Sequence, residues 1–187
     1  YGGGERNFLD IYLPDCELPT ALVIYVHGGG FTGGNKSAGH RNPGNVREFL
    51  DNCVAFATIN YFLLKVPSQE EGTDSIAAQG GVLSSLADAA LALQFLRYYF
   101  DPLNLDPTRV AMYGASAGAG ASLWMAAHDD MADPDSTDPI KKESTRILAA
   151  GALATQSTYD LLKWDQILLP ITQQFEEALG GTDVPTV

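Results

Sequence analysis

The sequence predicts an α/β domain in which helices cover both faces of a mostly parallel β-sheet. Apolar runs rich in β-branched residues alternate along the chain with stretches of helical spacing, which is typical of this fold class. The chain has 187 residues, of which 45% are hydrophobic and 18% are charged, as expected for one globular domain. No internal repeat or linker divides it, so we expect residues 1–187 to form a single domain.

Five segments have the composition of β-strands. The first ends at a proline, and the second and third are continuous apolar runs of the kind found in strands buried on both faces. The fourth leads into a stretch of glycine and alanine, and the fifth follows an Asp-rich segment. The predicted strands are residues 7–14, 20–27, 53–64, 109–114 and 146–155.

Four segments between and after these strands have helical spacing. The second is weakened by Gly80 and Gly81, and the last is interrupted at Pro170. The predicted helices are residues 45–52, 75–100, 116–128 and 159–180.

Composition and charge disfavour several classes of function. The formal net charge is -12, with only 11 basic residues and no basic run, which argues against nucleic-acid binding because phosphate contacts need clustered Lys and Arg. No uninterrupted apolar stretch is long enough to span a bilayer. The sequence begins at Tyr1 rather than Met, so a signal peptide and the cellular compartment stay open.

The sequence contains two cysteines, Cys16 and Cys53. Two are too few for the disulfide framework that stabilises many small secreted domains. Because free cysteines are among the most buried residues, we expect each to be a buried apolar thiol rather than half of a bridge.

A run of glycines follows the second predicted strand. His27 ends the strand, and residues 28–30 are all glycine. Ligands of parallel sheets bind beyond the carboxyl ends of the strands, where glycines leave backbone N–H groups accessible. Such groups can stabilise the oxyanion of a tetrahedral intermediate. A phosphate-binding loop is disfavoured, because Asn35 interrupts the Gly-Lys-Ser step that it requires.

Residues 114–118, Gly-Ala-Ser-Ala-Gly, lie between the fourth predicted strand and a predicted helix. Close packing of the strand and the helix would by itself explain these small residues. The spacing also fits Gly-x-Ser-x-Gly, a strained turn that presents a serine nucleophile at the start of a helix. Because the glycine run lies at the same edge of the predicted sheet, the two motifs together favour Ser116 as a nucleophile.

With these motifs, the chain resembles the α/β-hydrolase esterases and lipases of the hormone-sensitive-lipase-like and carboxylesterase groups. The resemblance covers most of the chain. It is carried by four segments, residues 7–14, 27–31 (His-Gly-Gly-Gly-Phe), 59–64 and 86–120. It implies the α/β-hydrolase fold, with the C-terminal strands missing from this chain.

The resemblance also implies roles for particular residues. Ser116 would be the catalytic nucleophile, and the backbone amides of Gly29, Gly30 and Ala117 would form the oxyanion hole. His27 would have a structural or loop-orienting role rather than that of the catalytic base.

Two positions depart from the pattern of the family. Phe62 stands where an arginine is usual, which removes an ion-pairing group and changes how the following loop is anchored. Ala115 replaces an acidic residue next to the nucleophile, which alters the local charge but not the geometry of the turn.

The rest of a catalytic triad is not found in this chain. In the resembled fold the general base follows the nucleophile, and His128 is the one histidine that does so. If residues 116–128 are helical, His128 lies about 18 Å along the axis from Ser116, beyond hydrogen-bond reach. Asp160 follows the fifth strand too closely to be the acid. We therefore expect a further C-terminal segment to supply the triad Asp and His, and residues 156–187 to form a cap or insertion.

Two other polar features receive no catalytic role. The segment 128–139 carries five aspartates, but its prolines and the lack of a glutamate at the twelfth position disfavour a calcium loop. We expect a solvated loop whose aspartates cap turns. Asp88, on the long predicted helix, is expected to face solvent or to act as a cap.

The sequence thus predicts a serine carboxylic-ester hydrolase that acts on short-chain acyl esters through an acyl-enzyme on Ser116. Its expected partner is a small-molecule ester, and no metal or organic cofactor is needed. A non-catalytic ligand-binding protein of the same fold and an acyltransferase with the same nucleophile stay open as alternatives, as does the oligomeric state.

Overall fold

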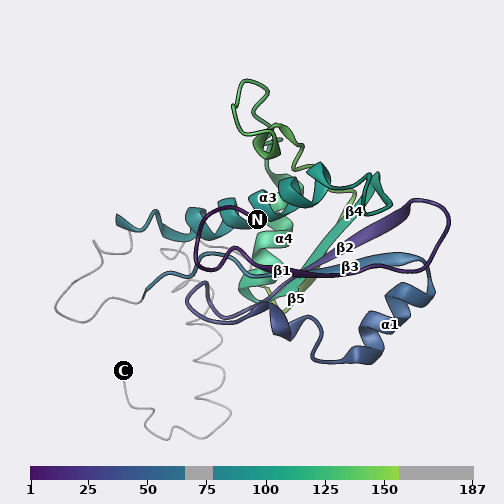
Figure 1. The fold of residues 1–187 in the computed structure, drawn as a ribbon. Helices are drawn as coiled ribbons and strands as arrows, with labels where there is room; N and C mark the ends of the chain where they lie inside the picture. Colours follow the sequence, from purple (N-terminus) through teal and green to yellow (C-terminus); the bar gives the residue numbers. More distant parts are fainter. Residues whose placement is uncertain (66–77, 156–187) are drawn as a thin grey trace, which may run out of the picture. The chain divides into compact units, whose positions relative to one another are not determined.

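A five-stranded sheet lies at the centre of the computed structural model, which describes residues 1–65 and 78–155 (Figure 1). The strand order is β1-β3-β2-β4-β5. The strands are β1 (Leu9–Tyr12), β2 (Thr20–Val26), β3 (Val54–Ile59), β4 (Leu105–Ala115) and β5 (Ala149–Leu153). β1 is antiparallel to β3 and the other pairs are parallel, so the predicted mostly parallel sheet is confirmed.

Helices lie on both faces of the sheet (Figure 1). The described helices are α1 (Pro43–Asp51), α3 (Gly81–Tyr98) and α4 (Ala117–Ala127), with the short 3-10 helices η1 (Lys36–Ala38) and η2 (Ile140–Lys142). α1 packs on β3 from one side, while α4 packs on β2, β4 and β5 from the other, with α3 beside it. Among the described residues, no helix has the length and apolar character needed to cross a membrane.

Local sequence explains where two of the helices begin. The Asn42 side chain accepts a hydrogen bond from the Gly44 amide at 3.1 Å and caps α1, whose first residue is Pro43. α3 begins only at Gly81, because Gly80 and Gly81 both have positive φ angles, 80° and 60°. The predicted helix 159–180 and the predicted cap region 156–187 lie outside the described residues.

The core lies between the sheet and the two helices α3 and α4. Leu22, Ile24 and Val26 of β2 are fully buried and belong to one cluster with Leu93 of α3 and Met125 of α4. Alternate residues of a strand point to opposite faces, so every second residue of β2 contributes to this core.

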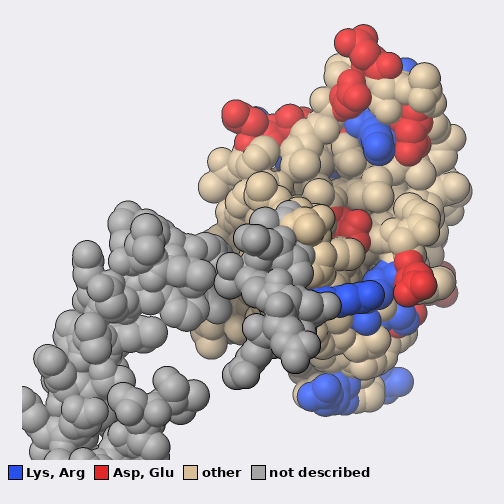
Figure 2. All heavy atoms as spheres, turned by 90° about the vertical axis from the view of Figure 1, so that its left-hand side faces the viewer, with Lys and Arg blue, Asp and Glu red and all other residues tan. Residues whose placement is uncertain are grey.

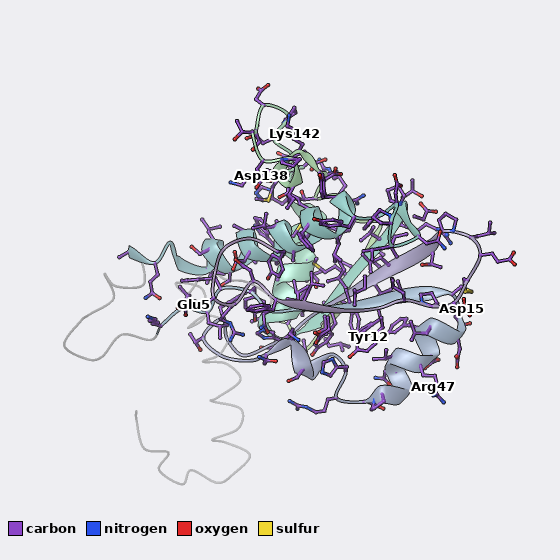
Figure 3. The ribbon with its side chains drawn as sticks, in the orientation of Figure 1. Glu5, Tyr12, Asp15, Arg47, Asp138 and Lys142 are labelled. Carbon is purple, nitrogen blue, oxygen red and sulfur yellow. A yellow bond between two sulfur atoms is a disulfide. The ribbon has the colours of Figure 1, made fainter. Side chains whose placement is uncertain are left out.

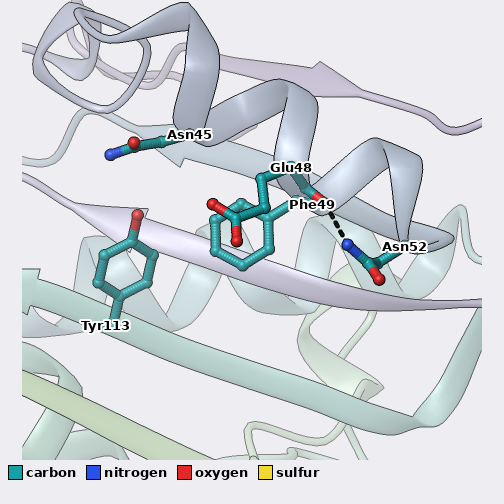
Figure 4. A pocket seen from close by; sticks show the side chains of 5 residues that line it. All are labelled: Asn45, Glu48, Phe49, Asn52 and Tyr113. Atoms are coloured by element: carbon teal, nitrogen blue, oxygen red, sulfur yellow. Dashed lines mark hydrogen bonds between the residues drawn. The ribbon is translucent and has the colours of Figure 1, made fainter.

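The face toward α1 is less fully covered. Tyr25 of β2 and Tyr113 of β4 are half-buried and pack edge to face, with ring centroids 5.1 Å apart. A groove separates α1 from β4 (Figure 4) and is lined by Asn45, Glu48, Phe49, Asn52 and Tyr113. In the described residues, α1 packs over β3 rather than over β4. The prediction that residues 20–27 are buried on both faces is therefore only partly correct.

β3 ends at Ile59, earlier than the predicted boundary at residue 64. From Asn60 onward the polar groups bond to loops instead of to a neighbouring strand. The Asn60 amide donates to Phe8 O at 3.0 Å, and its side chain accepts from the Lys36 amide at 2.7 Å. The amide of Leu64 donates to Phe31 O at 2.8 Å, so the end of this apolar run is attached to the glycine-rich loop.

The Asp-rich segment forms a loop at the end of the molecule marked by Asp138 and Lys142 in Figure 3. Figure 2 shows acidic side chains gathered at this end. Asp130 accepts a hydrogen bond from the Thr145 amide at 2.8 Å, and Asp138 accepts one from the Ile140 amide at 3.0 Å. The carboxylates thus cap turns of the loop itself, and no group of three potential metal ligands is found in the described part of the chain.

Cys16 and Cys53 form a disulfide, so the expectation of two buried thiols was wrong. Their Cα atoms are 6.1 Å apart, within the range that a disulfide spans. The parallel pairing of Ala21 with Val54 places the segments that precede β2 and β3 at the same edge of the sheet. Cys16 is half-buried and Cys53 is exposed there, so neither contributes to the core.

Removal of this disulfide is expected to destabilise the protein. The bridge joins residues 37 positions apart, so the double variant Cys16→Ser, Cys53→Ser should lose about 2–4 kcal/mol of unfolding free energy. Urea denaturation of the full-length protein without reductant measures this loss. Dithiothreitol should produce the same loss in the parent and none in the double variant. A parent protein whose denaturation midpoint is insensitive to dithiothreitol would contradict the prediction.

Candidate active site

Ser116 occupies the tight turn between β4 and α4. Its φ and ψ angles are 53° and -120°, a conformation that residues with a side chain rarely adopt. A Cβ atom at Gly114 would lie 2.4 Å from Val26 O, and one at Gly118 would lie 2.0 Å from the same oxygen. The two glycines of the motif are therefore needed because strand and helix approach β2 too closely for any side chain.

Backbone hydrogen bonds hold the turn from both sides. The Ser116 amide donates to Leu153 O of β5 at 2.9 Å, and its carbonyl accepts from the Gly120 amide at 3.0 Å. Within residues 1–65 and 78–155, no hydrogen bond involves the Ser116 hydroxyl. The serine side chain is half-buried at the carboxyl edge of the sheet.

The glycine-rich loop lies directly against this turn. β2 and β4 are parallel neighbours, with Val26 opposite Gly114, so both strands end at the same edge. A Cβ atom at Gly28 would lie 3.3 Å from the Cβ of Ser116 and 2.7 Å from Ala115 O. The two motifs that are 88 positions apart in sequence (116 − 28) are thus neighbours in space.

Three backbone amides in the two motifs are candidates to bind an oxyanion. Gly29 and Gly30 have φ angles of 119° and 61°, and the turn closes through hydrogen bonds from Thr32 and Gly33 to Gly29 O, each at 3.0 Å. The backbone amides of Gly29 and Gly30 donate no hydrogen bond to another described residue. Ala117 is the first residue of α4, where helix geometry leaves the amide without an intrahelical acceptor and the dipole is positive.

His27 lies behind the loop, away from solvent. It is 1% exposed, its ring stacks on Tyr61 with centroids 4.2 Å apart, and its Nδ1 lies 2.8 Å from Gly28 O. Burial lowers the pKa of His27, which favours the neutral ring with Nδ1–H donating to that carbonyl. Its Nε2 has no partner among the described residues.

The two other histidines lie away from Ser116 and are not placed to act as its base. His128 follows the last residue of α4, at the end opposite to Ser116, and its ring packs on Trp124 at 4.2 Å. His40 lies 3.0 Å from the Tyr12 hydroxyl, beside Asp10 of the edge strand β1. The described residues thus bring together Ser116 and the glycine-rich loop, and leave the base and acid of a triad unassigned.

Asp88 is a residue whose environment the sequence did not reveal. We expected it to face solvent or to cap a helix, but its carboxylate accepts a hydrogen bond from Asn7 Nδ2 at 3.0 Å. Ser85 Oγ donates to Phe62 O at 2.6 Å. Burial is the main cause that raises the pKa of Asp88. α3 thus holds the backbone carbonyl of Phe62, the position where the resembled family carries arginine.

A mostly parallel sheet with helices on both faces, a serine in a positive-φ turn after β4 and a glycine-rich loop beside it are the features of the α/β-hydrolase fold. The model of the BD-FAE family matches residues 9–182, and the chain belongs to this family.

Individual relatives agree with this placement. The chain is 28% identical over 121 residues to gut esterase 1 of Caenorhabditis elegans, an alignment that covers 65% of this chain and 21% of the relative. It is 32% identical over 108 residues to lipase 1 of Geotrichum candidum, which covers 57% of this chain and 18% of the relative. The chain therefore spans about a fifth of the length of these curated relatives.

Solved structures share the fold. An acetyl ester-xyloside bifunctional hydrolase from Caldicellulosiruptor lactoaceticus superposes with a TM-score of 0.61 at 23% identity, covering 77% of this chain and 47% of that one. Propionate-bound esterase 2 of Thermogutta terrifontis gives 0.60 at 21% identity, covering 87% and 56%. The α/β-hydrolase fold expected from the sequence is thus confirmed, and the chain spans about half of each solved relative.

Proposed function

We propose that the full-length protein is a serine carboxylic-ester hydrolase with Ser116 as its nucleophile. The observation that carries this proposal is the contact between the two motifs: Ser116 sits in a positive-φ turn, and the Cβ position of Gly28 lies 3.3 Å from the serine Cβ. Packing alone explains small residues at either place, but it does not explain why Ser116 has a positive φ or why the amides of Gly29 and Gly30 donate no hydrogen bond to another described residue. The esterase and lipase relatives support the same assignment.

In the proposed reaction, the Ser116 oxygen attacks the ester carbonyl while a general base takes its proton. The amides of Gly29, Gly30 and Ala117 donate hydrogen bonds to the oxyanion that forms on the carbonyl oxygen. The protonated base then gives its proton to the departing alcohol, and an acyl-enzyme remains on Ser116. Water, activated by the same base, attacks the acyl-enzyme and releases the carboxylic acid.

We place the base and its acidic partner, a histidine and an aspartate, in a segment beyond residue 187. His27 is buried behind the loop, and His128 lies at the opposite end of α4. The chain spans only about half of the length of the esterase structures that share its fold.

The proposal is tested by assaying the full-length protein with p-nitrophenyl acetate. We expect turnover that is lost progressively and irreversibly when an organophosphonate is added. Release of p-nitrophenol that rises on adding an alcohol acceptor would instead favour acyl transfer. Substrate binding without turnover would favour a non-catalytic binding protein.

Within this function, we expect a preference for short acyl chains. Esterase 2 of Thermogutta terrifontis, which shares the fold, has been solved with propionate and with butyrate bound. The value of kcat/KM should be highest on p-nitrophenyl esters of about two to six acyl carbons, and lower by at least about tenfold on those of twelve to sixteen. A maximum on the long-chain esters would contradict the expected preference.

A further inference from the structure

Four residues of the proposed oxyanion loop, residues 28–34, have positive φ angles. Gly29, Gly30 and Gly34 have φ angles of 119°, 61° and 101°, and Phe31, which carries a side chain, has a φ of 61°. A positive φ is unfavourable for a residue other than glycine, so Phe31 keeps this conformation only because surrounding contacts hold it. The position of the loop amides therefore depends on the contacts between the loop and the residues around it.

Arg6 forms a hydrogen bond with Gly34, the last residue of this loop. This arginine lies in the segment before β1, and its Nη2 donates to Gly34 O at 2.9 Å while its Nε donates to Tyr61 O at 3.1 Å. Tyr61 is 55 positions away and Gly34 is 28 positions away in the sequence. One guanidinium thus joins the glycine-rich loop to the segment that follows β3.

The two residues that Arg6 binds, Gly34 and Tyr61, both contact the residues at the start of the loop beside Ser116. A Cβ atom at Gly34 would lie 2.3 Å from His27 Nδ1 and 2.3 Å from Gly28 O, so Gly34 backs directly onto these groups. The Tyr61 hydroxyl donates to His27 O at 2.8 Å, and its ring stacks on the His27 ring. Gly28 is in turn packed against Ser116. A shift of Gly34 or Tyr61 is therefore passed to the residues that precede the candidate oxyanion amides.

The segment that carries Arg6 is attached to α3 through the neighbouring residue Asn7. Asn7 is buried, accepts a hydrogen bond from the Gly4 amide at 2.6 Å, and donates to the Asp88 carboxylate at 3.0 Å. Ser85 of α3 donates to Phe62 O at 2.6 Å, so α3 is attached both to the segment that carries Arg6 and to the segment that carries Tyr61. The guanidinium is placed by the fold rather than left on a free terminus.

We propose that Arg6 is a positioning residue of the oxyanion hole, because its guanidinium bridges Gly34 and Tyr61 and so holds loop 28–34 against Ser116. The proposal rests on the proposed esterase function. A guanidinium presents parallel donors in a fixed plane, whereas a lysine ammonium is a single point on a flexible stem. The sequence offered no signal for this role, because Arg6 belongs to neither motif.

Two measurements on the full-length protein test this role, with the variants Arg6→Ala and Arg6→Lys. The loop amides act on the oxyanion, so kcat should fall by about tenfold or more in both variants, with KM changed by less than about twofold. Amide hydrogen exchange should become at least about tenfold faster within residues 28–34 and stay unchanged in β2 and β4. The control is Arg41→Ala, because Arg41 is exposed and makes no hydrogen bond or ion pair to another described residue.

Parent-like kcat together with parent-like exchange in Arg6→Ala would overturn the proposal. So would exchange that accelerates equally in β2 and β4, since that result would show a general structural role. Full recovery of kcat in Arg6→Lys would overturn the requirement for a bridging guanidinium. If the parent protein hydrolyses no ester and an organophosphonate leaves Ser116 unlabelled, the esterase proposal fails on its own. The exchange measurement then still decides whether Arg6 holds the loop.

Discussion

The variant Ser116→Ala is expected to lose ester hydrolysis, with a decrease in kcat on the order of 10⁴-fold or more. The hydroxyl oxygen forms the covalent bond of the acyl-enzyme in the proposed mechanism, so no other group in the turn can replace it. The side chain is half-buried and makes no hydrogen bond to another described residue, so its removal should leave the thermal unfolding midpoint nearly unchanged. Initial rates on p-nitrophenyl acetate and a thermal unfolding curve measure both quantities.

Ser37→Ala is the matched control for this variant. Ser37 is exposed in η1, and its hydroxyl also has no hydrogen bond to another described residue. It should keep the parent value of kcat. A Ser116→Ala protein that hydrolyses the ester at the parent rate would show that the serine turn is a packing feature and not a nucleophile.

The variant Gly28→Ala is expected to have the next largest effect, a decrease in kcat of about 10²-fold with a small change in KM. The new Cβ would lie 2.7 Å from Ala115 O and 3.3 Å from the Ser116 Cβ. The first of these atoms belongs to the backbone of β4, which cannot rotate away, so the loop must move. The amides of Gly29 and Gly30 move with it, away from the oxyanion they are proposed to bind.

Gly33→Ala provides a control in the same loop. A Cβ at Gly33 would come no closer than 3.8 Å to Gly29 O, an ordinary contact, and its φ is not positive. Its kcat and its unfolding midpoint should stay close to those of the parent. Equal kcat values in Gly28→Ala and Gly33→Ala would show that the loop amides play no part in catalysis.

The fold was predictable because its signals are local. The apolar runs at residues 20–27 and 53–64 contain the parallel neighbours β2 and β3, as their composition indicates. The glycines at 114 and 118 could be recognised by their spacing around a serine, and their close approach to Val26 O explains that spacing. Contact between the two motifs followed from the rule that parallel strands end at one edge.

Other features depend on contacts between distant segments and leave no periodic pattern. Arg6 and Asp88 are single polar residues whose partners lie many positions away, 81 in the case of Asp88 and Asn7. Nothing in their sequence neighbourhood distinguishes them from exposed residues. The Cys16–Cys53 bridge was missed for a related reason, since it depends on where the loop before β2 meets the entry to β3. Sequence spacing does not define that meeting point.

The measurement that tests the central claim most directly is the site of covalent labelling in the full-length wild-type protein. The protein should be treated with a fluorophosphonate and digested, and the labelled residue should be identified by mass spectrometry. The account predicts one adduct per molecule, on the peptide that contains Ser116, appearing in step with the loss of ester hydrolysis. An adduct on another residue, or hydrolysis that persists after Ser116 is fully labelled, would contradict it.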